Sequence, residues 1–217
     1  QEQLLRIISR MVEDSRAISG SAVAFEPAVF EKDLHWFAPY YFKGKSGITY
    51  EQLGSDSYDY FTKDWYHLPK VLKRPVWTDP YFDEGAGGII MTTYARPFFE
   101  GGVGGAGSKV KGIVTADVSL EWLTNLVFSV PVAQTGYCFI VSDTGHFVTH
   151  PDPKLIMYES MFSLAEILNR PELREIGKNM VRGRQGLVAL KSLTGGEKIW
   201  MVYSPIPSCR WTFAAVI

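Results

Sequence analysis

The spacing of apolar residues predicts a helix at the start of the chain. Within residues 1–18 the apolar positions recur every three or four residues, as on one face of a helix: Leu4, Leu5, Ile8, Met11, Val12 and Ile18. Gly20 ends this pattern. The apolar run Ser21–Phe25 then predicts a strand, which Pro27 terminates. The chain is therefore expected to begin with an amphipathic helix that leads into a sheet.

The remaining patterns predict two successive groups of strands and helices. In the first group we expect strands over 36–43, 48–53, 89–99 and 110–118, and helices over 60–72 and 119–127. In the second group we expect strands over 137–142, 146–150, 187–192, 198–205 and 211–217, and helices over 161–169 and 171–182. Turns at Gly195-Gly196 and Pro207–Arg210 are expected to join the last three strands as a meander.

A short internal repeat indicates two copies of one module. Met91–Pro97 resembles Met201–Pro205, and each segment is followed by a loop and a second apolar strand. Pro131 marks a boundary between the two groups of elements. We therefore predict the α/β (α+β) fold class, with two modules that each contain an antiparallel sheet and are joined near Val127–Gln134.

The composition excludes several classes of protein. The 22 Lys and Arg residues are balanced by 23 Asp and Glu residues, which gives a net charge of −1. A non-specific nucleic-acid binder needs a basic surplus, so no nucleic-acid partner is expected. No apolar run reaches the roughly 18 residues of a membrane span. The chain starts at Gln1 without a Met, so we take it as a fragment whose membrane anchor lies outside it.

The candidate metal, cofactor and catalytic motifs favour structural interpretations. Cys138 and Cys209 lack the spacing of metal ligands, and free thiols are favoured over a disulfide. His146 and His150 lie on a predicted strand, where four positions separate side chains by about 13 Å. Gly102–Gly107 fits G-x-G-x-x-G, but a strand follows it, so a hairpin loop is expected. No nucleophile–base pair is evident, and we expect no enzyme, no metal and no cofactor.

The segment from Tyr58 to Asp117 carries most of the candidate binding chemistry. Its aromatic residues crowd around one lysine, Lys63, and precede the carboxylate of Asp117: Tyr58, Tyr60, Trp65, Tyr66, Trp77 and Tyr81. Aromatic walls with a few polar groups are typical of a small-ligand pocket, although an aromatic core with surface charges has the same composition. Asp117 ends a run of small and apolar residues, so its side chain must face solvent, a partner or a ligand. The acidic run Asp79–Glu84 is expected to form a turn around Pro80.

Several short motifs occur in an order that resembles a known family. They are Asp64–Tyr66 (DWY), Trp77–Asp83 (WTDPYFD), Met91–Pro97 (MTTYARP), Gly112–Leu120 (GIVTADVSL), Gly136–Pro151 (GYCFIVSDTGHFVTHP) and Trp200–Pro205 (WMVYSP). Over essentially the whole chain they resemble the double Cache family of extracytoplasmic sensor domains. A finer resemblance is to sensors attached to serine phosphatases of the bacterial stress-sigma-factor pathway, or to those of another signal transducer.

The resemblance implies an architecture and a location. It implies a long N-terminal helix over residues 1–19, a membrane-distal PAS-like Cache module over 20–130 that binds the ligand, and a membrane-proximal module over 131–217. The chain would be the periplasmic or extracellular part of an inner (cell) membrane protein, held in the membrane by segments outside it. A homodimer through the N-terminal helix is the assembly that we expect.

The resemblance also implies a ligand site. Amino-acid-sensing members of the family carry binding residues at positions that match Tyr58, Trp65, Tyr66, Tyr81 and Asp117, with Arg at the position of Lys63. Lys offers a point charge where Arg offers a planar fork, so a carboxylate, an amine and an amino-acid-like metabolite all remain open as the ligand. Binding is expected to shift the distal module between two arrangements that are relayed to the membrane. The alternative is a structural or interaction scaffold of the same fold with an empty pocket.

Overall fold

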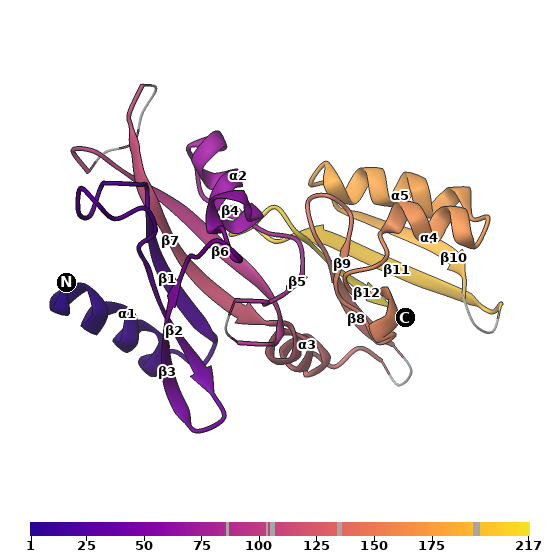
Figure 1. Cartoon of the computed structure of the whole chain (residues 1–217). Coiled ribbons are helices and arrows are strands. Elements are labelled where there is room, and N and C mark those ends of the chain that lie inside the picture. Colours follow the sequence, from indigo (N-terminus) through magenta and orange to yellow (C-terminus); the bar gives the residue numbers. More distant parts are fainter. Residues whose placement is uncertain (86, 103, 105–106, 134–135, 193–195) are drawn as a thin grey trace. The chain divides into compact units, whose positions relative to one another are not determined.

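The computed structural model describes residues 1–85, 87–102, 104, 107–133, 136–192 and 196–217. The chain divides into two compact units, Gln1–Ser119 and Leu120–Ile217. Each unit contains one antiparallel sheet with helices, and Figure 1 shows the elements in chain order. The predicted α+β class with two sheet modules is therefore confirmed.

Unit 1 is built on a seven-stranded sheet. Its elements are α1 (Glu2–Asp14), β1 (Gly20–Phe25), β2 (Ala38–Gly44), β3 (Gly47–Leu53), the 3-10 turn η1 (Tyr60–Thr62), α2 (Asp64–Leu72), β4 (Val76–Trp77), β5 (Tyr81–Phe82), β6 (Ile90–Phe99) and β7 (Val110–Ser119). The strand order is β3-β2-β1-β7-β6-β4, and β5 also pairs with β6. All of these pairings are antiparallel.

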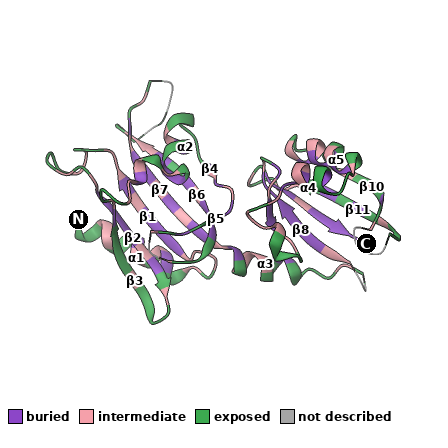
Figure 2. Ribbon diagram, turned by 45° about the vertical axis from the view of Figure 1, so that its right-hand side comes forward, coloured by how far each residue is buried: buried purple, intermediate pink, exposed green. Residues whose placement is uncertain are grey.

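The helices of unit 1 pack on different strands. α1 buries Ile8 and Val12 and contacts β1, β2 and β3, as its apolar stripe predicts. α2 contacts β4, β6 and β7 and buries Trp65 and Tyr66. The long β6–β7 hairpin runs through the middle of the sheet, where the residues are mostly buried (Figure 2). It pairs Thr93 directly with Asp117.

The predicted 60–72 helix is interrupted at Lys63. The Asp59 carboxylate accepts a hydrogen bond from the Phe61 N–H and so caps η1, after which Lys63 takes an extended conformation (φ −79°, ψ 142°). α2 starts after Lys63 and contains Pro69. Lys63 therefore lies between η1 and α2 and is not part of a helix.

Unit 2 is built on a five-stranded sheet with the order β10-β11-β12-β8-β9. Its elements are α3 (Leu120–Phe128), β8 (Tyr137–Val141), β9 (Phe147–Thr149), the 3-10 turn η2 (Pro153–Leu155), α4 (Met161–Ile167), α5 (Pro171–Val181), β10 (Gly186–Lys191), β11 (Lys198–Pro205) and β12 (Thr212–Val216). The core gathers Phe139, Phe147, Met161 and Met180 from the sheet and from α4 and α5. The predicted meander β10–β11–β12 is confirmed, whereas Gly195 of its first turn lies outside the described residues.

The boundary between the units differs from the expected position near Val127–Gln134. It falls between Ser119 and Leu120, because α3 packs against β8 and β9 and so belongs with unit 2. Cys138 and Cys209 are free thiols, as predicted. In the described ranges no helix is long and apolar enough to cross a membrane.

The glycine-rich loop joins two strands, as predicted. β6 leads into it and β7 leads out of it, and the Glu100 N–H donates to the Lys109 carbonyl at its base. The helix that a dinucleotide fingerprint requires does not follow. Residues 103, 105 and 106 of the G-x-G-x-x-G motif lie outside the described residues.

Candidate ligand-binding site

A narrow cavity in unit 1 lies where β1, β2, β6 and β7 meet the first turn of α2. Four of the six residues expected in the site line it: Tyr58, Trp65, Tyr81 and Asp117. The other lining residues are Ala22, Tyr40, Leu53, Asp83, Met91 and Thr115. Its free volume is about 10 Å³, which is roughly the room that one water molecule needs. Pockets for drug-sized ligands span about 300–1,000 Å³, so even a small metabolite would enter only if lining side chains moved apart.

Asp117 is the buried acid at the base of this cavity. Its side chain is only 3% exposed, and its Oδ1 accepts a 2.8 Å hydrogen bond from the Thr93 hydroxyl. Because the Thr93 hydrogen points to Asp117, the Tyr81 hydroxyl, 2.6 Å from Thr93 Oγ1, is the donor in that second contact. The Tyr40 hydroxyl also bonds the Asp117 carboxylate. Three hydroxyl groups therefore form a hydroxyl relay, that is, a hydrogen-bond network around one carboxylate. Thr93 and Tyr40 bond Asp117 directly, and Tyr81 bonds Thr93.

Gly20 makes room for the Tyr40 contact. Gly20 is the register partner of Asp117 on β1, and the Tyr40 ring lies over it. A Cβ at position 20 would come within 2.3 Å of the Tyr40 hydroxyl oxygen. Any larger residue would push Tyr40 aside, so glycine at this position lets the hydroxyl reach Asp117.

Burial controls the charge of the cavity. Desolvation raises the pKa of Asp117 to about 7, and the negative charge of Asp83 adds to this, while the bonds from Thr93 and Tyr40 oppose it. Desolvation also raises the pKa of Tyr58 and Tyr81, so both hydroxyl groups stay neutral at physiological pH. No lysine or arginine is among the lining residues that the structure describes.

Asp83 is a second lining carboxylate that the sequence analysis assigned to a turn. It is 5% exposed, and its two oxygens accept hydrogen bonds from the Gly85 N–H (3.0 Å) and the Gly87 N–H (2.6 Å). The turn that Asp83 stabilises follows β5, whereas the sequence predicts a turn around Pro80, and the same side chain also faces the cavity. The available signal was the strand period, because residues 81 and 83 point to the same side of an extended segment.

Tyr40 was missed for a different reason. It lies on β2, and its contact with Asp117 follows from pairing strands that are far apart in the sequence.

The aromatic residues that the sequence groups around Lys63 do not all lie in the cavity. Tyr60 is fully buried, and its hydroxyl donates to the Phe25 carbonyl at 2.8 Å, while Trp77 lies against the Tyr94 ring.

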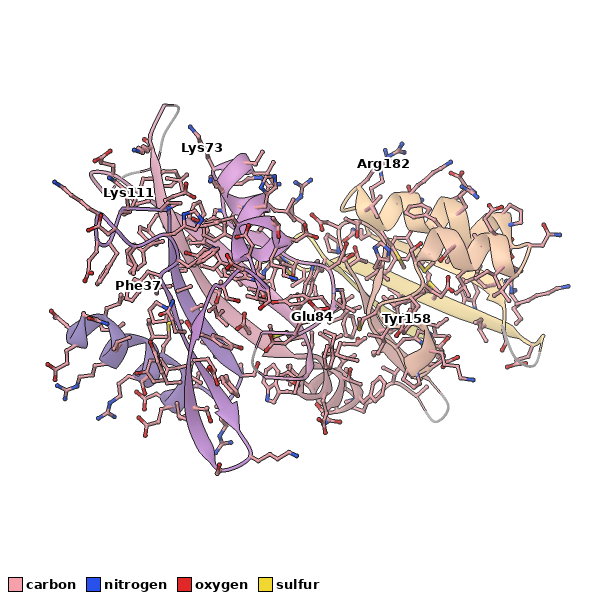
Figure 3. All side chains as sticks on the ribbon, viewed as in Figure 1. Phe37, Lys73, Glu84, Lys111, Tyr158 and Arg182 are labelled. Carbon is pink, nitrogen blue, oxygen red and sulfur yellow. The ribbon has the colours of Figure 1, made fainter. Side chains whose placement is uncertain are left out.

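Lys63 does not line the cavity. Its amine forms a 3.1 Å ion pair with Glu84 and lies 4.9 Å from the centre of the Tyr58 ring. Figure 3 shows Glu84 on the loop that follows β5. Lys63 was expected in the site on a continuous helix over residues 60–72. Because Lys63 instead occupies the break before α2, its side chain pairs with this loop.

Tyr66 does not line the cavity either. It is completely buried in the core, and its hydroxyl donates a 2.5 Å hydrogen bond to Glu26. Lys70 completes this group with a 2.8 Å ion pair to Glu26. Successive helix residues point about 100° apart, so Trp65 can face the cavity while Tyr66 faces the neighbouring core.

Comparison with known proteins finds sensor domains of chemotaxis proteins among those that this chain resembles. A family model described as the first PDC sensor domain of methyl-accepting chemotaxis protein-like proteins matches residues 4–125. The chemotaxis protein McpG of Pseudomonas putida is 26% identical over 159 residues, which cover 72% of this chain and 22% of that protein. The chain spans about a fifth of the length of the first curated relatives that it matches.

Solved structures share the fold. The extracellular domain of the putative histidine kinase mmHK1S-Z3 is 26% identical with a TM-score of 0.83, covering 100% of this chain and 78% of that chain. The ligand-binding domain of the Pseudomonas aeruginosa amino acid chemoreceptor PctB, in complex with L-Gln, has a TM-score of 0.63 at 17% identity. That match covers 100% of this chain and 74% of that chain. In sequence, PctB is 28% identical over 100 residues, which cover 46% of this chain and 15% of the receptor.

Proposed function

The chain belongs to the family of methyl-accepting chemotaxis protein-like first PDC sensor domains, and from this premise we propose that unit 1 senses a small organic amine. The double Cache resemblance drawn from the motifs is thereby confirmed. The ligand would occupy the cavity around Asp117, with its ammonium group directed at the carboxylate. The chain itself would carry out no catalysis.

The charge of the cavity is the observation that carries this proposal. Two buried carboxylates, Asp83 and Asp117, line it, and no cation is among its described lining residues. A ligand carboxylate would meet buried negative charge without a partner, which is costly. An ammonium group would neutralise Asp117 and lie near the rings of Tyr40, Tyr58, Trp65 and Tyr81, whose faces attract cations.

The relatives support the amine part of this assignment. The PctB ligand-binding domain was solved with L-Gln and with L-Arg, and both ligands carry an amino group. An amino acid also needs a partner for its carboxylate. The one nearby candidate at the matching family position is Lys63, and Glu84 holds it in an ion pair. We therefore favour an amine without a carboxylate over a free amino acid.

A route for the signal follows from the hydroxyl relay. Binding of a cation would ionise Asp117 and strengthen its bonds to Thr93 and Tyr40, because charged acceptors form stronger hydrogen bonds. These two residues lie on β6 and β2, and Tyr81 extends the relay to β5. Ligand binding would thus tighten four strands around one carboxylate. We propose that this change is the signal and that segments outside this chain pass it across the membrane.

We further propose an extracytoplasmic location, in keeping with the extracellular domains among the relatives. The attachment to a serine phosphatase and the homodimer through the N-terminal helix stay predictions. Ile7 on α1 is 58% exposed, which gives a dimer an apolar contact to use.

The proposal can be tested by calorimetric titration of the chain with a panel of small ligands. Primary amines, diamines and quaternary ammonium ions should bind, and the Asp117→Asn variant should lose this binding. Acetate, succinate and other carboxylates should not bind at this site. If the anions bind and the amines do not, the amine assignment is wrong. If neither class binds, the ligand-free scaffold takes its place.

A further inference from the structure

Unit 1 contains a second and larger cavity, whose first residue on β6, Arg96, lies three positions beyond Thr93. Its free volume is about 520 Å³, against about 10 Å³ for the cavity around Asp117. It lies between the end of α2 and the far end of β6. It is lined by Lys73, Pro75, Arg96, Pro97, Phe98 and Phe99, together with Gly102 and Gly104 of the glycine-rich loop.

The cavity results from a strand that stops early. After α2, Lys73 takes a left-handed conformation (φ 50°), and the chain turns through Pro75 into β4. β4 pairs with only two residues of β6, Tyr94 and Ala95. The next four residues of β6 therefore have no β4 partner at this edge, and the end of α2 overhangs them. In Figure 3 Lys73 extends from this end of α2 on the side of the β6–β7 hairpin.

The cavity has a net positive charge that the protein does not neutralise. Lys73 and Arg96 line it, and neither forms an ion pair with any residue in the described part of the chain. Neighbouring lysines are paired, since Lys70 contacts Glu26 and Lys111 contacts Glu100. No carboxylate is among the described lining residues. Because the carbonyl end of α2 is the negative end of its dipole, the two cations must supply the attraction for an anion.

The walls of the cavity are apolar and well supported. The Phe98 ring packs edge-on against Phe25 at 5.3 Å and covers Gly112, where a Cβ would come within 2.5 Å of the ring. The Phe99 ring lies against Gly104 in the same way. Pro75 and Pro97 add rigid apolar surface. Fixed phenyl and proline faces favour a flat ring, which can stack or pack edge-on.

From the charge and the walls together we propose that this cavity is a second ligand site, for a small aromatic carboxylate. The Arg96 guanidinium would grip the carboxylate through its two-pronged fork, with Lys73 as a second positive charge. Pro97 and Phe99 point to the same face of β6, so the ring would pack against them and Pro75, while Arg96, from the other face, would reach the carboxylate past the edge that β4 leaves unpaired. This site shares no lining residue with the amine cavity and is independent of the proposed amine function.

The test is a titration of the 217-residue chain with benzoate, followed by calorimetry and by amide chemical shifts. We expect saturable binding that perturbs the amides of residues 73–76 and 96–99. Arg96→Gln and Lys73→Gln should each weaken it by about tenfold or more. Lys45→Gln, a matched change at an exposed lysine on the β2–β3 turn, should leave it unchanged. Acetate, which lacks the ring, and benzylamine, which reverses the charge, should fail to bind here.

Asp117→Ala separates this proposal from the first one. Benzoate should bind this variant as it binds the parent chain, while amine binding is lost. The proposal is overturned if benzoate, phenylacetate and hydroxybenzoate produce no saturable signal. It is also overturned if both glutamine variants bind benzoate normally, or if Asp117→Ala alone abolishes the binding. Lys45, Lys73 and Arg96 are exposed, and Asp117 is a buried residue of the other cavity. The thermal unfolding curve of each variant checks that it is folded.

Discussion

The Thr93 hydroxyl donates a 2.8 Å hydrogen bond to Asp117, its direct partner across the β6–β7 pair. The backbone pairing of the two strands places these two short side chains directly opposite each other. Both residues are at most 3% exposed. The Asp117 carboxylate thus lies in the buried part of the sheet. The pH dependence of stability and of ligand binding can therefore test the proposed sensing mechanism.

The first prediction is that Asp117 destabilises the free protein near neutral pH. Burial raises the pKa of Asp117 to about 7, above the value of about 3.9 for an unfolded aspartate. The folded state therefore binds more protons between these two values, so the free energy of unfolding falls as pH rises from about 4 to 7. Asp117→Asn should remove this dependence and raise stability at pH 8 by about 2–4 kcal/mol. Urea unfolding of both proteins at pH 5 and pH 8 measures the effect, and equal pH profiles would contradict it.

The second prediction concerns the pH dependence of amine binding. Only the ionised Asp117 attracts an ammonium group, and with a pKa of about 7 the ionised fraction rises about tenfold between pH 6 and pH 8. The affinity for an amine should rise by a similar factor, because the amine itself stays protonated. Binding at pH 6.5 should also release a proton, which calorimetry detects by comparing buffers of different ionisation enthalpy. An affinity that is flat between pH 6 and pH 8 would rule out Asp117 as the ammonium partner.

The patterns of the sequence predicted the strands well and the site partly. The β6–β7 hairpin, α1 and the C-terminal meander follow from apolar periodicity, which records local burial. Tyr81 and Asp117 follow from the family motifs, and Asp117 also from the run of small and apolar residues that it ends. Tyr40 could not be found, since only strand pairing over long sequence distance brings it to Asp117. Lys63 was misplaced because the helix starts after it. Tyr66 was misplaced because successive helix residues point about 100° apart, so it faces the core when Trp65 faces the cavity.

The third prediction separates Thr93 from its neighbour Thr92. Thr93→Val removes the hydrogen bond to Asp117, which lowers the pKa of that carboxyl, so its loss should raise this pKa further. Amine affinity at pH 7 should fall several-fold and recover at higher pH. Thr92→Val is the matched control, because Thr92 is equally buried but donates to the Thr78 carbonyl. It should lower stability by about 1–2 kcal/mol and leave the pH midpoint of binding unchanged.

The fourth prediction uses Lys63 to distinguish an amine from an amino acid. Its ion pair with Glu84 is largely exposed, so Lys63→Ala should change stability by less than about 1 kcal/mol. If the ligand is a simple amine, its affinity should stay within about twofold of the parent value. A large loss of affinity would instead mean that Lys63 leaves Glu84 and binds a ligand carboxylate. In that case the ligand is an amino acid, and Glu84→Gln should tighten its binding.

The fifth prediction compares two tyrosines that sequence reasoning assigned to the same site. Tyr66→Phe removes the 2.5 Å bond to Glu26 and leaves the Lys70–Glu26 pair in place. It should lower the free energy of unfolding by about 1–3 kcal/mol, as expected for a buried bond to a charged group. Because Tyr66 does not line the cavity, amine affinity and its pH midpoint should not change. Tyr81→Phe removes a hydroxyl that donates to Thr93 within the relay, so it should weaken amine binding and shift that midpoint. Measured by the same titration between pH 6 and pH 8, equal effects of the two variants on binding would show that the ligand lies elsewhere in the aromatic cluster.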